Sequence, residues 1–536
     1  MSADINPSEL IREGRTTLGI ELGSTRIKAC LVGDDPSVVL AVGEHEWENQ
    51  LVDGRWSYAL DDVWAGLRAA YAAVVADTQA RHGTIPTTFG AIGVSAMMHG
   101  YLAFDAAGEL LVPFRTWRNT STGPAAAELT REFGVNIPLR WSIAHLHQAV
   151  LDAEPHVSRT ASVTTLAGYV HRRLTGEHVL GIGDASGMFP IDDATRTYDP
   201  AMLATYDRLV DSRAPWRLVD LLPRVLPAGR AAGVLSTEGA ALLDPSGVLQ
   251  PGILFCPPEG DAGTGMVATN SVAPREGNVS AGTSIFAMVV LERPLTAVHD
   301  ELDVVTTPAG NPVAMVHCNN GASELAAWVS VFRRFADAAG QPLTPDAAYS
   351  ALLTEALSGE ADAGGILAYN QLAGEPIAGL DEGRPLVVRT NDSRFTLGNL
   401  MRAQVYGVFA TLSLGMAVLD DEGVVLDRMF AHGGVFRTAG VAQRFLAAAL
   451  HVPVSVGETA SEGGAWGIAV LAAYARAASG SSNPALSLAD FLRDRVFTGA
   501  GVSVVEPHPD DVAGFASYLA SYRSGLAIER AAAHAI

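Results

Sequence analysis

Apolar positions follow two different spacings along the chain. Short apolar runs over residues 17–20 and 27–32, separated by a turn at 23–25, predict a β-hairpin near the start. Apolar residues then recur at helical spacing over 63–75, and a further strand-like run covers 91–95. Because strands that alternate with helices are typical of α/β domains, we expect an α/β fold.

The second half repeats the opening pattern. Residues 277–290 form a predicted strand, a Gly282-Thr283-Ser284 turn and a second strand, about half a chain after the first hairpin. Later, a long helix over 397–419 precedes a strand over 429–432 that ends at Gly433-Gly434. Turns at strand ends are where α/β sheets usually bind ligands. We therefore predict two related domains, over residues 15–271 and 272–525.

Composition narrows the class of protein. The 536 residues are 48% hydrophobic and 18% charged, which is enough to bury the cores of two or more domains. A formal charge of −22, without clustered Lys and Arg, argues against a nucleic-acid partner. The start lacks an export signal and no apolar run reaches bilayer-spanning length, so we expect a cytoplasmic protein without a membrane partner. Three cysteines in apolar runs are expected to be buried thiols: Cys30, Cys256 and Cys318.

One acidic residue stands in a glycine-rich stretch near the middle of the chain. Asp261 follows Gly260 and precedes Gly263, after an apolar run over 253–256, so we expect an acid on a tight turn at a strand end. An ordinary surface turn has the same composition. No helix pattern follows Gly260 and no acid lies at the required distance, which argues against a dinucleotide fold. The P-loop, HExxH, paired CxxC and GxSxG signatures are absent from the sequence.

The two hairpin turns share a glycine followed by two hydroxyl residues. Gly23-Ser24-Thr25 and Gly282-Thr283-Ser284 could present backbone N–H groups and hydroxyls to phosphate oxygens. A single turn of this kind would be an ordinary β-turn, but two in equivalent places favour a phosphate clamp. Glu21 enters the first turn and could hold Mg²⁺ through water, or be a solvated acid at a strand end.

Taken together, these segments resemble a known family. In their order, and over residues 17–475, they are similar to the FGGY carbohydrate kinases, and the resemblance rests on the following segments: Gly19 to Thr25, Ser95 to Gly100, Leu174 to Glu177, Asp184 to Gly187, Gly260-Asp261, Gly282 to Ser284, and Gly433-Gly434 with Gln443. The resemblance implies two actin-like ATPase domains of ribonuclease H type, with an active-site cleft between the domains. It also implies a sugar and Mg-ATP as partners, with ATP and Mg²⁺ as cofactors.

The same resemblance indicates which residues would bind the sugar. Met98 and His99 are similar to the xylulokinase segment in which the histidine contacts the sugar; gluconate kinases carry a related Met-His, whereas glycerol kinases differ. Taken alone, His99 would be a hydrogen-bonded loop histidine. Trp117, Arg118 and Asn119 occupy the place of a Trp-x-Asp segment, where an indole can pack on sugar C–H groups while Arg and Asn bond hydroxyls. A lone Trp is more often a core residue.

Three residues depart from the family pattern. Glu21 and Asn119 each replace an aspartate, and Val435 replaces a third glycine after Gly433-Gly434. Glutamate is one methylene group longer than aspartate, so the Glu21 carboxylate reaches farther toward a metal. Asn119 removes a charge from the predicted sugar site, and Val435 shifts the turn on which adenine is expected to lie.

The function we expect is transfer of the γ-phosphate of ATP to a hydroxyl of a ketopentose, with xylulose as the first candidate. Asp261 would accept the hydroxyl proton, bind the sugar and help hold the metal, while Gly433-Gly434 and the helix after Glu462-Gly463-Gly464 complete the nucleotide pocket. Ribulose, gluconate or a polyol are alternative substrates. An actin-like ATPase that moves a partner protein and a sugar-binding protein with little turnover are alternatives from other classes. A homodimer is left open.

Overall fold

The computed structural model describes residues 6–457, 463–479, 486–499 and 501–535, and it divides into two compact units. The first unit comprises the described parts of Met1–Ala273, Val304–Val313 and Thr459–Gly499. The second comprises those of Pro274–Asp303, Ala314–Glu458 and Ala500–Ile536. The chain therefore leaves the first unit and returns to it twice.

The first unit is built on a five-stranded sheet in the order β13-β6-β1-β2-β3. Strands β1 and β2 form the predicted hairpin, β3 continues it antiparallel, and β6 and β13 run parallel to β1. The strands are β1 (Thr17–Leu22), β2 (Arg26–Val32), β3 (Val39–Glu46), β6 (Ala91–Ala96) and β13 (Glu259–Gly260). Three antiparallel strands beside two parallel ones give the sheet of a ribonuclease H-like domain, as predicted.

Two long helices cover the two faces of this sheet. Helix α2 (Leu60–His82) packs on the face that carries Ile20, whose side chain is fully buried in the core of the first unit. Helix α15 (Gly463–Ser479) packs on the opposite face, where a Cβ at Gly19 would lie 2.1 Å from the Ala465 carbonyl oxygen. Glycine is required there because the two backbones approach so closely.

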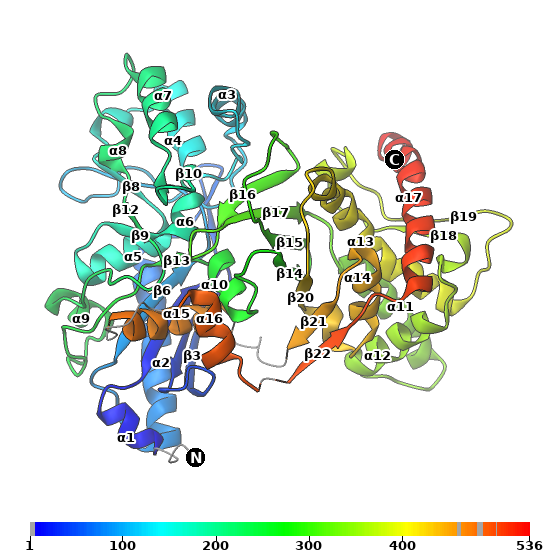
Figure 1. Cartoon of the computed structure of the whole chain (residues 1–536), viewed down its shortest axis with the longest axis horizontal. Helices are drawn as coiled ribbons and strands as arrows, with labels where there is room; N and C mark the ends of the chain where they lie inside the picture. Colours follow the sequence, from blue (N-terminus) through cyan, green and yellow to red (C-terminus); the bar gives the residue numbers. More distant parts are fainter. Residues whose placement is uncertain (1–5, 458–462, 480–485, 500, 536) are drawn as a thin grey trace. The chain divides into compact units, whose positions relative to one another are not determined.

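The remaining elements of the first unit extend it around the sheet (Figure 1). They are the helices α1 (Pro7–Arg12), α3 (Gly123–Phe133), α4 (Ser142–Leu151), α5 (Leu166–Thr175), α6 (Ile182–Ser186), α7 (Pro200–Val210), α8 (Leu218–Leu221), α9 (Thr237–Leu243), α10 (Asp261–Ala268) and α16 (Leu488–Phe491), and the short strands β4 (Gln50–Val52), β5 (Arg55–Ser57), β7 (Leu102–Phe104), β8 (Ser162–Thr164), β9 (Val179–Gly181), β10 (Ile191–Asp192), β11 (Thr197–Tyr198) and β12 (Arg224–Leu226).

The second unit repeats this strand order. Most of a seven-stranded sheet in the order β16-β17-β15-β14-β20-β21-β22 lies in this unit, with β14 and β15 antiparallel, and β20 and β21 following β14 in parallel. Residues 304–306 of β16 and 312–313 of β17 are grouped with the first unit. The strands are β14 (Glu276–Ala281), β15 (Ile285–Val290), β16 (Leu302–Thr306), β17 (Pro312–Cys318), β20 (Arg428–His432), β21 (Val454–Gly457) and β22 (Val502–Val505). The predicted relation between the two halves is thus present as a shared sheet topology.

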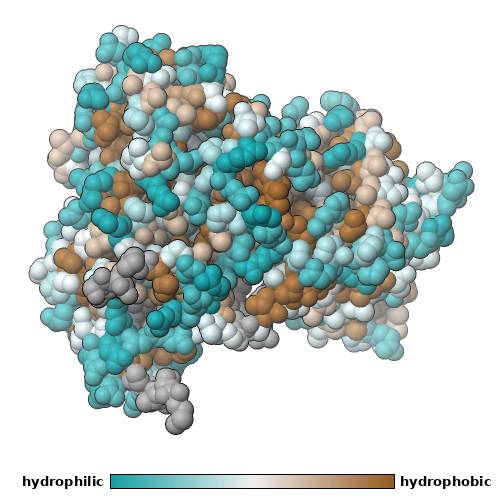
Figure 2. Space-filling view, viewed as in Figure 1, coloured by the Kyte–Doolittle hydropathy of each residue, from teal (hydrophilic) through white to brown (hydrophobic). Residues whose placement is uncertain are grey.

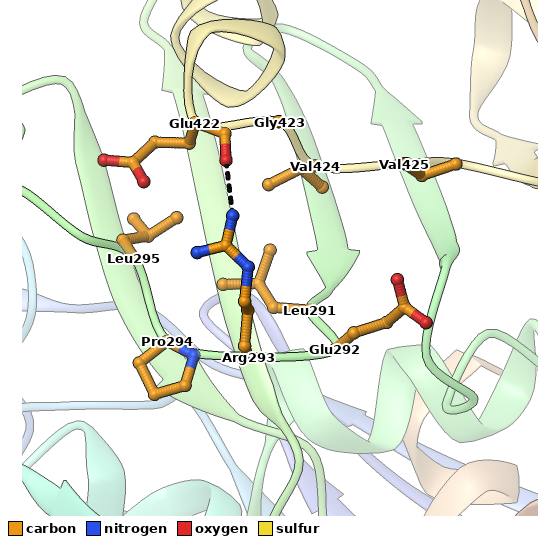
Figure 3. A pocket seen from close by; sticks show the side chains of 9 residues that line it. All are labelled: Leu291, Glu292, Arg293, Pro294, Leu295, Glu422, Gly423, Val424 and Val425. Atoms are coloured by element: carbon orange, nitrogen blue, oxygen red, sulfur yellow. Dashed lines mark hydrogen bonds between the residues drawn. The ribbon is translucent and has the colours of Figure 1, made fainter.

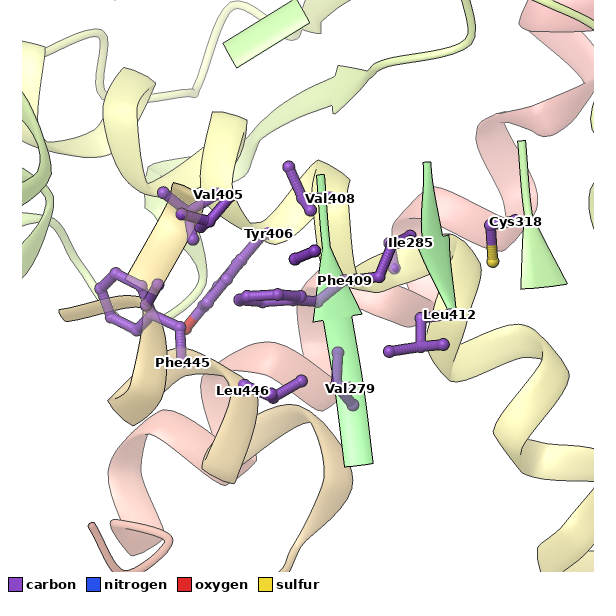
Figure 4. Packing of buried hydrophobic residues seen from close by; sticks show 14 of the residues in the cluster. Val279, Ile285, Cys318, Val405, Tyr406, Val408, Phe409, Leu412, Phe445 and Leu446 are labelled. Atoms are coloured by element: carbon purple, nitrogen blue, oxygen red, sulfur yellow. The ribbon is translucent and has the colours of Figure 1, made fainter. Parts of the chain in front are cut away.

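The helices of the second unit enclose an apolar core. Around its sheet lie α11 (Ser323–Ala338), α12 (Pro345–Glu355), α13 (Leu397–Asp421), α14 (Val441–Leu450) and α17 (Pro509–Ala535), with a small β18 (Ile366–Tyr369) and β19 (Leu386–Arg389) pair. Figure 4 shows Tyr406 and Phe409 of α13 packed with Phe445 of α14 and with Val279 and Ile285 of the sheet.

Helix α13 corrects the expectation that no apolar run reaches bilayer-spanning length. Among the described residues it is the one helix long and apolar enough to cross a membrane, yet 78% of its most apolar 18-residue window is buried inside the protein. Its apolarity therefore reflects its central place in the core. The three cysteines are also buried, as predicted. Hydrophilic residues cover most of the face in Figure 2, with apolar residues scattered among them.

Candidate active site

Asp261 stands at a strand-to-helix junction in the first unit. It directly follows β13 and is the first residue of α10, so the predicted tight turn is in fact the start of a helix that the glycine-rich sequence concealed. Its Oδ1 accepts hydrogen bonds from the backbone N–H groups of Met98 and Ala262, both at 3.0 Å. Neither of these bonds uses Oδ2.

The surroundings of Asp261 act on its pKa in opposite directions. Its side chain reaches the surface of the first unit, but desolvation by the protein atoms around it raises the pKa above the ordinary aspartate value. The two backbone N–H groups stabilise the carboxylate and limit that rise. A carboxylate with a raised pKa and one oxygen left over is suited to accept a proton.

Met98 and His99 lie beside this acid. A Cβ at Gly260 would come within 2.8 Å of the Met98 side chain, so glycine lets the two segments touch. His99 is buried, and its Nδ1 lies 3.3 Å from the Gly187 carbonyl oxygen. Burial, reinforced by the charge of Arg140, lowers the His99 pKa to about 3. The ring is therefore neutral; Nδ1–H donates to Gly187, and Nε2 is left as an acceptor.

The segment from Trp117 to Asn119 makes several contacts within the first unit. The Trp117 indole N–H donates to the Ser24 hydroxyl at 3.3 Å, and the Arg118 guanidinium stacks on Trp56. Asn119 is buried and uses both its oxygen and its amide hydrogens on the backbone of Trp56 and Thr116. Asn119 thus holds β5 in place, and Trp117 contacts the first hairpin turn.

Glu21 faces α15. The carboxylate accepts a hydrogen bond from the Ala465 backbone N–H, and a Cβ at Gly464 would lie 2.2 Å from Glu21 Oε1. Burial, together with the negative charge of Asp261, raises the Glu21 pKa to about 7. Because the charge of Asp261 acts on Glu21, the two predicted metal ligands belong to one neighbourhood.

No protein-only metal site is formed in the described part of the chain, since no group of three His, Cys, Asp or Glu side chains is arranged to hold an ion. Mg²⁺ is commonly bound by one or two carboxylates together with substrate phosphates, so it needs no such group. Asp261 and Glu21 are the residues of the first unit that would supply such carboxylates.

The first hairpin turn is anchored by aromatic side chains. The Trp47 indole N–H donates to the Gly23 carbonyl oxygen at 2.8 Å, and the Tyr58 hydroxyl donates to the Ser24 carbonyl oxygen at 2.6 Å. The rings of Trp47 and Tyr58 stack on one another, with centroids 4.2 Å apart. The carbonyl groups of the turn are therefore held from one side, while Thr25 stays exposed.

In the second unit, the other turn and the glycine pair lie together. The backbone N–H groups of Gly321 and Ala322 donate to the carbonyl oxygens of Thr283 and Gly282, at 2.7 and 2.8 Å. Gly433 has φ 113°, and a Cβ there would lie 2.2 Å from the Ala281 carbonyl oxygen, next to the turn. At Gly434, by contrast, an added Cβ would meet no atom within 4 Å. The predicted nucleotide residues of this unit thus form one exposed cluster.

Two features of the neighbourhood were missed or misplaced by sequence reasoning. The helix after Gly463-Gly464 belongs to the first unit and bonds Glu21, although we had grouped it with Gly433-Gly434 of the second; Glu462 lies outside the described residues. The buried acids Glu259 and Asp184 were given no role. The sequence signal for Glu259 was its place two residues before Asp261.

A small cavity of about 80 Å³ lies in the second unit between residues 291–295 and 422–425 (Figure 3). Arg293 points into it and donates to the Glu422 carbonyl oxygen at 2.9 Å. The Glu422 carboxylate accepts bonds from Thr296, Ala297 and His299, which lower its pKa to about 2. None of the predicted site residues lines this cavity. The hydrogen bonds between Glu422 and the loop after β15 hold that loop in place.

The two sheets and their hairpins define the class of protein: a pair of ribonuclease H-like units of the kind found in actin-like ATPases. The sequence matches the N-terminal domain of the FGGY family of carbohydrate kinases over residues 16–250 and the C-terminal domain of the same family over 277–476. The chain belongs to the FGGY family of carbohydrate kinases. The resemblance read from its motifs is thereby confirmed.

Individual relatives are distant. A protein named xylulose kinase from Streptomyces coelicolor is 26% identical over 233 residues, which is 42% of this chain and 45% of that protein. The chain spans about half the length of the curated relatives it matches. Among solved structures, xylulose kinase from Rhodospirillum rubrum is 22% identical with TM-score 0.76, covering 96% of this chain and 99% of that one.

A gluconate kinase structure fits the fold equally well. The enzyme of that name from Lactobacillus acidophilus has TM-score 0.75 at 18% identity, over 96% of this chain and 99% of that one. The fold is therefore shared by kinases with different substrates, and it does not choose among them.

Proposed function

We propose that the protein transfers the γ-phosphate of ATP to a hydroxyl group of a ketopentose, with xylulose as the first candidate. The observation that carries the proposal is the pairing of Asp261 with the Met98-His99 segment, because it sets a proton acceptor beside a neutral histidine whose Nε2 can accept a bond from a sugar hydroxyl. The names of the relatives support xylulose.

In this mechanism Asp261 accepts the proton of the sugar hydroxyl as the hydroxyl oxygen attacks the γ-phosphorus. The O–H bond breaks, an O–P bond forms, and the bond from the γ-phosphorus to the bridging oxygen breaks, so that ADP leaves. Since phosphoryl transfer has a loose transition state, positioning and charge stabilisation supply most of the rate. The weak base therefore suffices if the proton moves late.

The turns and glycines would divide the work of binding ATP. In this proposal the phosphate oxygens are bound by backbone N–H groups and hydroxyls of the two turns, Gly23 to Thr25 and Gly282 to Ser284. Adenine lies on Gly433-Gly434, where no side chain stands in the way. Mg²⁺, when bound with the phosphates, would neutralise charge that develops on them. Asp261 directly, and Glu21 through water, are the proposed protein ligands.

On the sugar side, the structural roles found for Trp117 and Asn119 narrow the proposal. Met98, His99 and Asp261 are the proposed direct contacts, Trp117 offers the exposed part of its indole, and Arg118 offers its guanidinium. Asn119 contributes by holding Trp56, on which Arg118 stacks. A cytoplasmic location and a homodimer stay predictions.

A substrate panel tests the proposed function. Purified protein with Mg-ATP is assayed for ADP release with xylulose, ribulose, gluconate and polyols, each at several concentrations. We expect sugar-dependent ADP with xylulose at the highest kcat/KM. A higher value with gluconate would reassign the substrate, and no sugar-dependent ADP with any compound would reject the kinase proposal in favour of a binding protein.

A further inference from the structure

Glu259 is a buried acid next to the proposed catalytic residue, and nothing described so far uses it. It stands two residues before Asp261 and is only 1% exposed. Its carboxylate accepts the backbone N–H groups of Gly183 at 3.3 Å and Asp184 at 2.9 Å, at the start of α6. Burial and the charge of the neighbouring Asp184 raise the pKa of Glu259 to about 8, and the hydrogen bonds from Asp184 and Gly183 partly offset that rise.

The surrounding backbone is shaped around this carboxylate. A Cβ at Gly181 would lie 2.2 Å from Glu259 Oε1, and a Cβ at Gly183 would lie 2.5 Å from Oε2. These distances are shorter than any real Cβ contact, so either alanine would push the carboxylate out of place. Two glycines therefore make room for one acid, which indicates a specific arrangement and not a chance burial.

The bonds of Glu259 close a ring of contacts around Asp261. From Glu259 the ring passes to α6, whose end carries Gly187; the Gly187 carbonyl oxygen bonds His99 Nδ1. His99 adjoins Met98, whose backbone N–H donates to Asp261 Oδ1. Asp261 returns to Glu259 through Gly260 along the chain. Three chain segments distant in sequence are thus joined pairwise, each by a hydrogen bond or a covalent link.

Such a ring fixes the distance between the acid and the histidine. Helix α6 is also bonded to Thr165 and Thr306, but the Glu259 side chain supplies its hydrogen bonds to β13. Without those bonds, α6 can shift against β13, and the Gly187 carbonyl oxygen that orients His99 shifts with it. We propose that Glu259 is a positioning residue, which sets His99 and Asp261 at the separation that the phosphoryl transfer needs. This inference rests on the proposed function. A misplacement of about 1 Å can cost about 100-fold in rate, so the expected effect is measurable.

The test compares Glu259→Ala with Glu259→Gln, which keeps one acceptor oxygen. We expect Glu259→Ala to lower kcat for sugar phosphorylation about 50-fold while KM for ATP changes less than twofold. Glu259→Gln should recover at least tenfold of that loss. The proposal is overturned if Glu259→Ala keeps kcat within threefold of the unmodified protein, or if Gln is no better than Ala.

A second pair of variants probes the same contact from α6. Gly183→Ala should lower kcat much as Glu259→Ala does, because its Cβ displaces the carboxylate. In the Glu259→Ala background the added methyl group meets no carboxylate, so Gly183→Ala should then cost less than threefold. Full multiplication of the two effects would contradict the ring. Should Glu259→Ala fail to fold, Gly183→Ala and Glu259→Gln still decide the question by the same rates.

A measurement without substrate separates this proposal from the proposed function. Hydrogen–deuterium exchange of the peptide over residues 181–187 should be at least tenfold faster in Glu259→Ala than in the unmodified protein, and intermediate in Glu259→Gln. Unchanged exchange would overturn the ring whatever the protein phosphorylates. Faster exchange in a protein without sugar-dependent ADP release would keep the ring and reject the kinase.

Discussion

The two hairpin turns have nearly the same sequence, but they are held in different ways. The turn at Gly23 to Thr25 is anchored mainly by the side chains of Trp47, Tyr58 and Trp117, with one backbone bond from the Trp47 N–H to the Thr25 carbonyl oxygen. The turn at Gly282 to Ser284 is anchored by backbone N–H groups of the 321–322 segment. Two turns of similar sequence therefore depend on different parts of the chain. The conformation of the first turn is sensitive to side-chain substitutions, and that of the second to changes that move the backbone.

The same contrast extends to the surroundings of each turn. In the first unit, Asp261 accepts a hydrogen bond from the Met98 backbone N–H, and the next residue, His99, bonds Gly187, which gives a group that can do chemistry. In the second unit, Gly433 and Gly434 leave an open surface beside the turn. We infer that the first unit governs the rate of transfer and the second governs nucleotide affinity, and the variants below test that division.

The largest expected effect is that of Asp261→Asn. Loss of the proton acceptor should lower kcat about 1,000-fold, within the range of general-base catalysis, while KM for ATP changes little. Steady-state kinetics with the best sugar of the panel measures both constants. A kcat near that of the unmodified protein would remove Asp261 from catalysis, and a large rise in KM for ATP alone would break the division between the units.

Gly433→Ala and Gly434→Ala form a matched pair in the second unit. At Gly433 the positive φ and the close Ala281 carbonyl oxygen should cost about 3 kcal/mol and lower Tm. At Gly434 the added methyl group meets no protein atom, so Tm should stay within about 1 °C. If adenine lies on this pair, KM for ATP rises about tenfold in both variants. Equal Tm losses would show that the distinction between them is wrong.

Glu21→Gln should stabilise the protein, and only above acidic pH. The Glu21 pKa is raised from 4.5 to about 7 in the folded protein, so the unfolded chain releases its proton first. Stability present below pH 4.5 is therefore lost as pH rises to about 7, by up to about 3 kcal/mol at about 1.4 kcal/mol per unit. Glutamine lacks this titration.

Melting curves at pH 4.5 and pH 8 measure this effect. The difference in Tm between Glu21→Gln and the unmodified protein should be small at pH 4.5 and several degrees in favour of Gln at pH 8. An equal difference at the two pH values would contradict the raised pKa. The Mg²⁺ dependence of kcat in the same variant tests whether Glu21 also serves the metal.

Tyr58→Phe should have the smallest effect, and it is specific to the first turn. The variant keeps the ring that stacks on Trp47 but leaves the Ser24 carbonyl oxygen without its bond, at a cost of about 1 kcal/mol. Because the first unit is inferred to govern the rate, we expect kcat to fall about threefold, with little change in KM for ATP or in Tm. An unchanged kcat would show that the side-chain anchor does not shape the turn.

The sequence by itself determined much of the architecture. Hydrophobic periodicity located both hairpins, helix α13 and strand β20, because those elements bury a regular apolar face. The order of glycine and hydroxyl motifs was enough to identify the family, and the resemblance pointed to Asp261 and Met98-His99 as candidate site residues. Such motifs are local in sequence, so they can be recognised without knowing which distant residues contact them.

Only the tertiary structure decided which distant residues share a partner. Helix α15 returns to the first unit and meets Glu21, because glycines at 19 and 464 allow close approach. Asn119 turns out to hold the backbone at Trp56, and Glu259 to bond α6. Glycine and buried acids carry no periodic signal, and their roles depend on atoms far along the chain. For that reason the local sequence predicted the acid, and the fold determined what holds it in place.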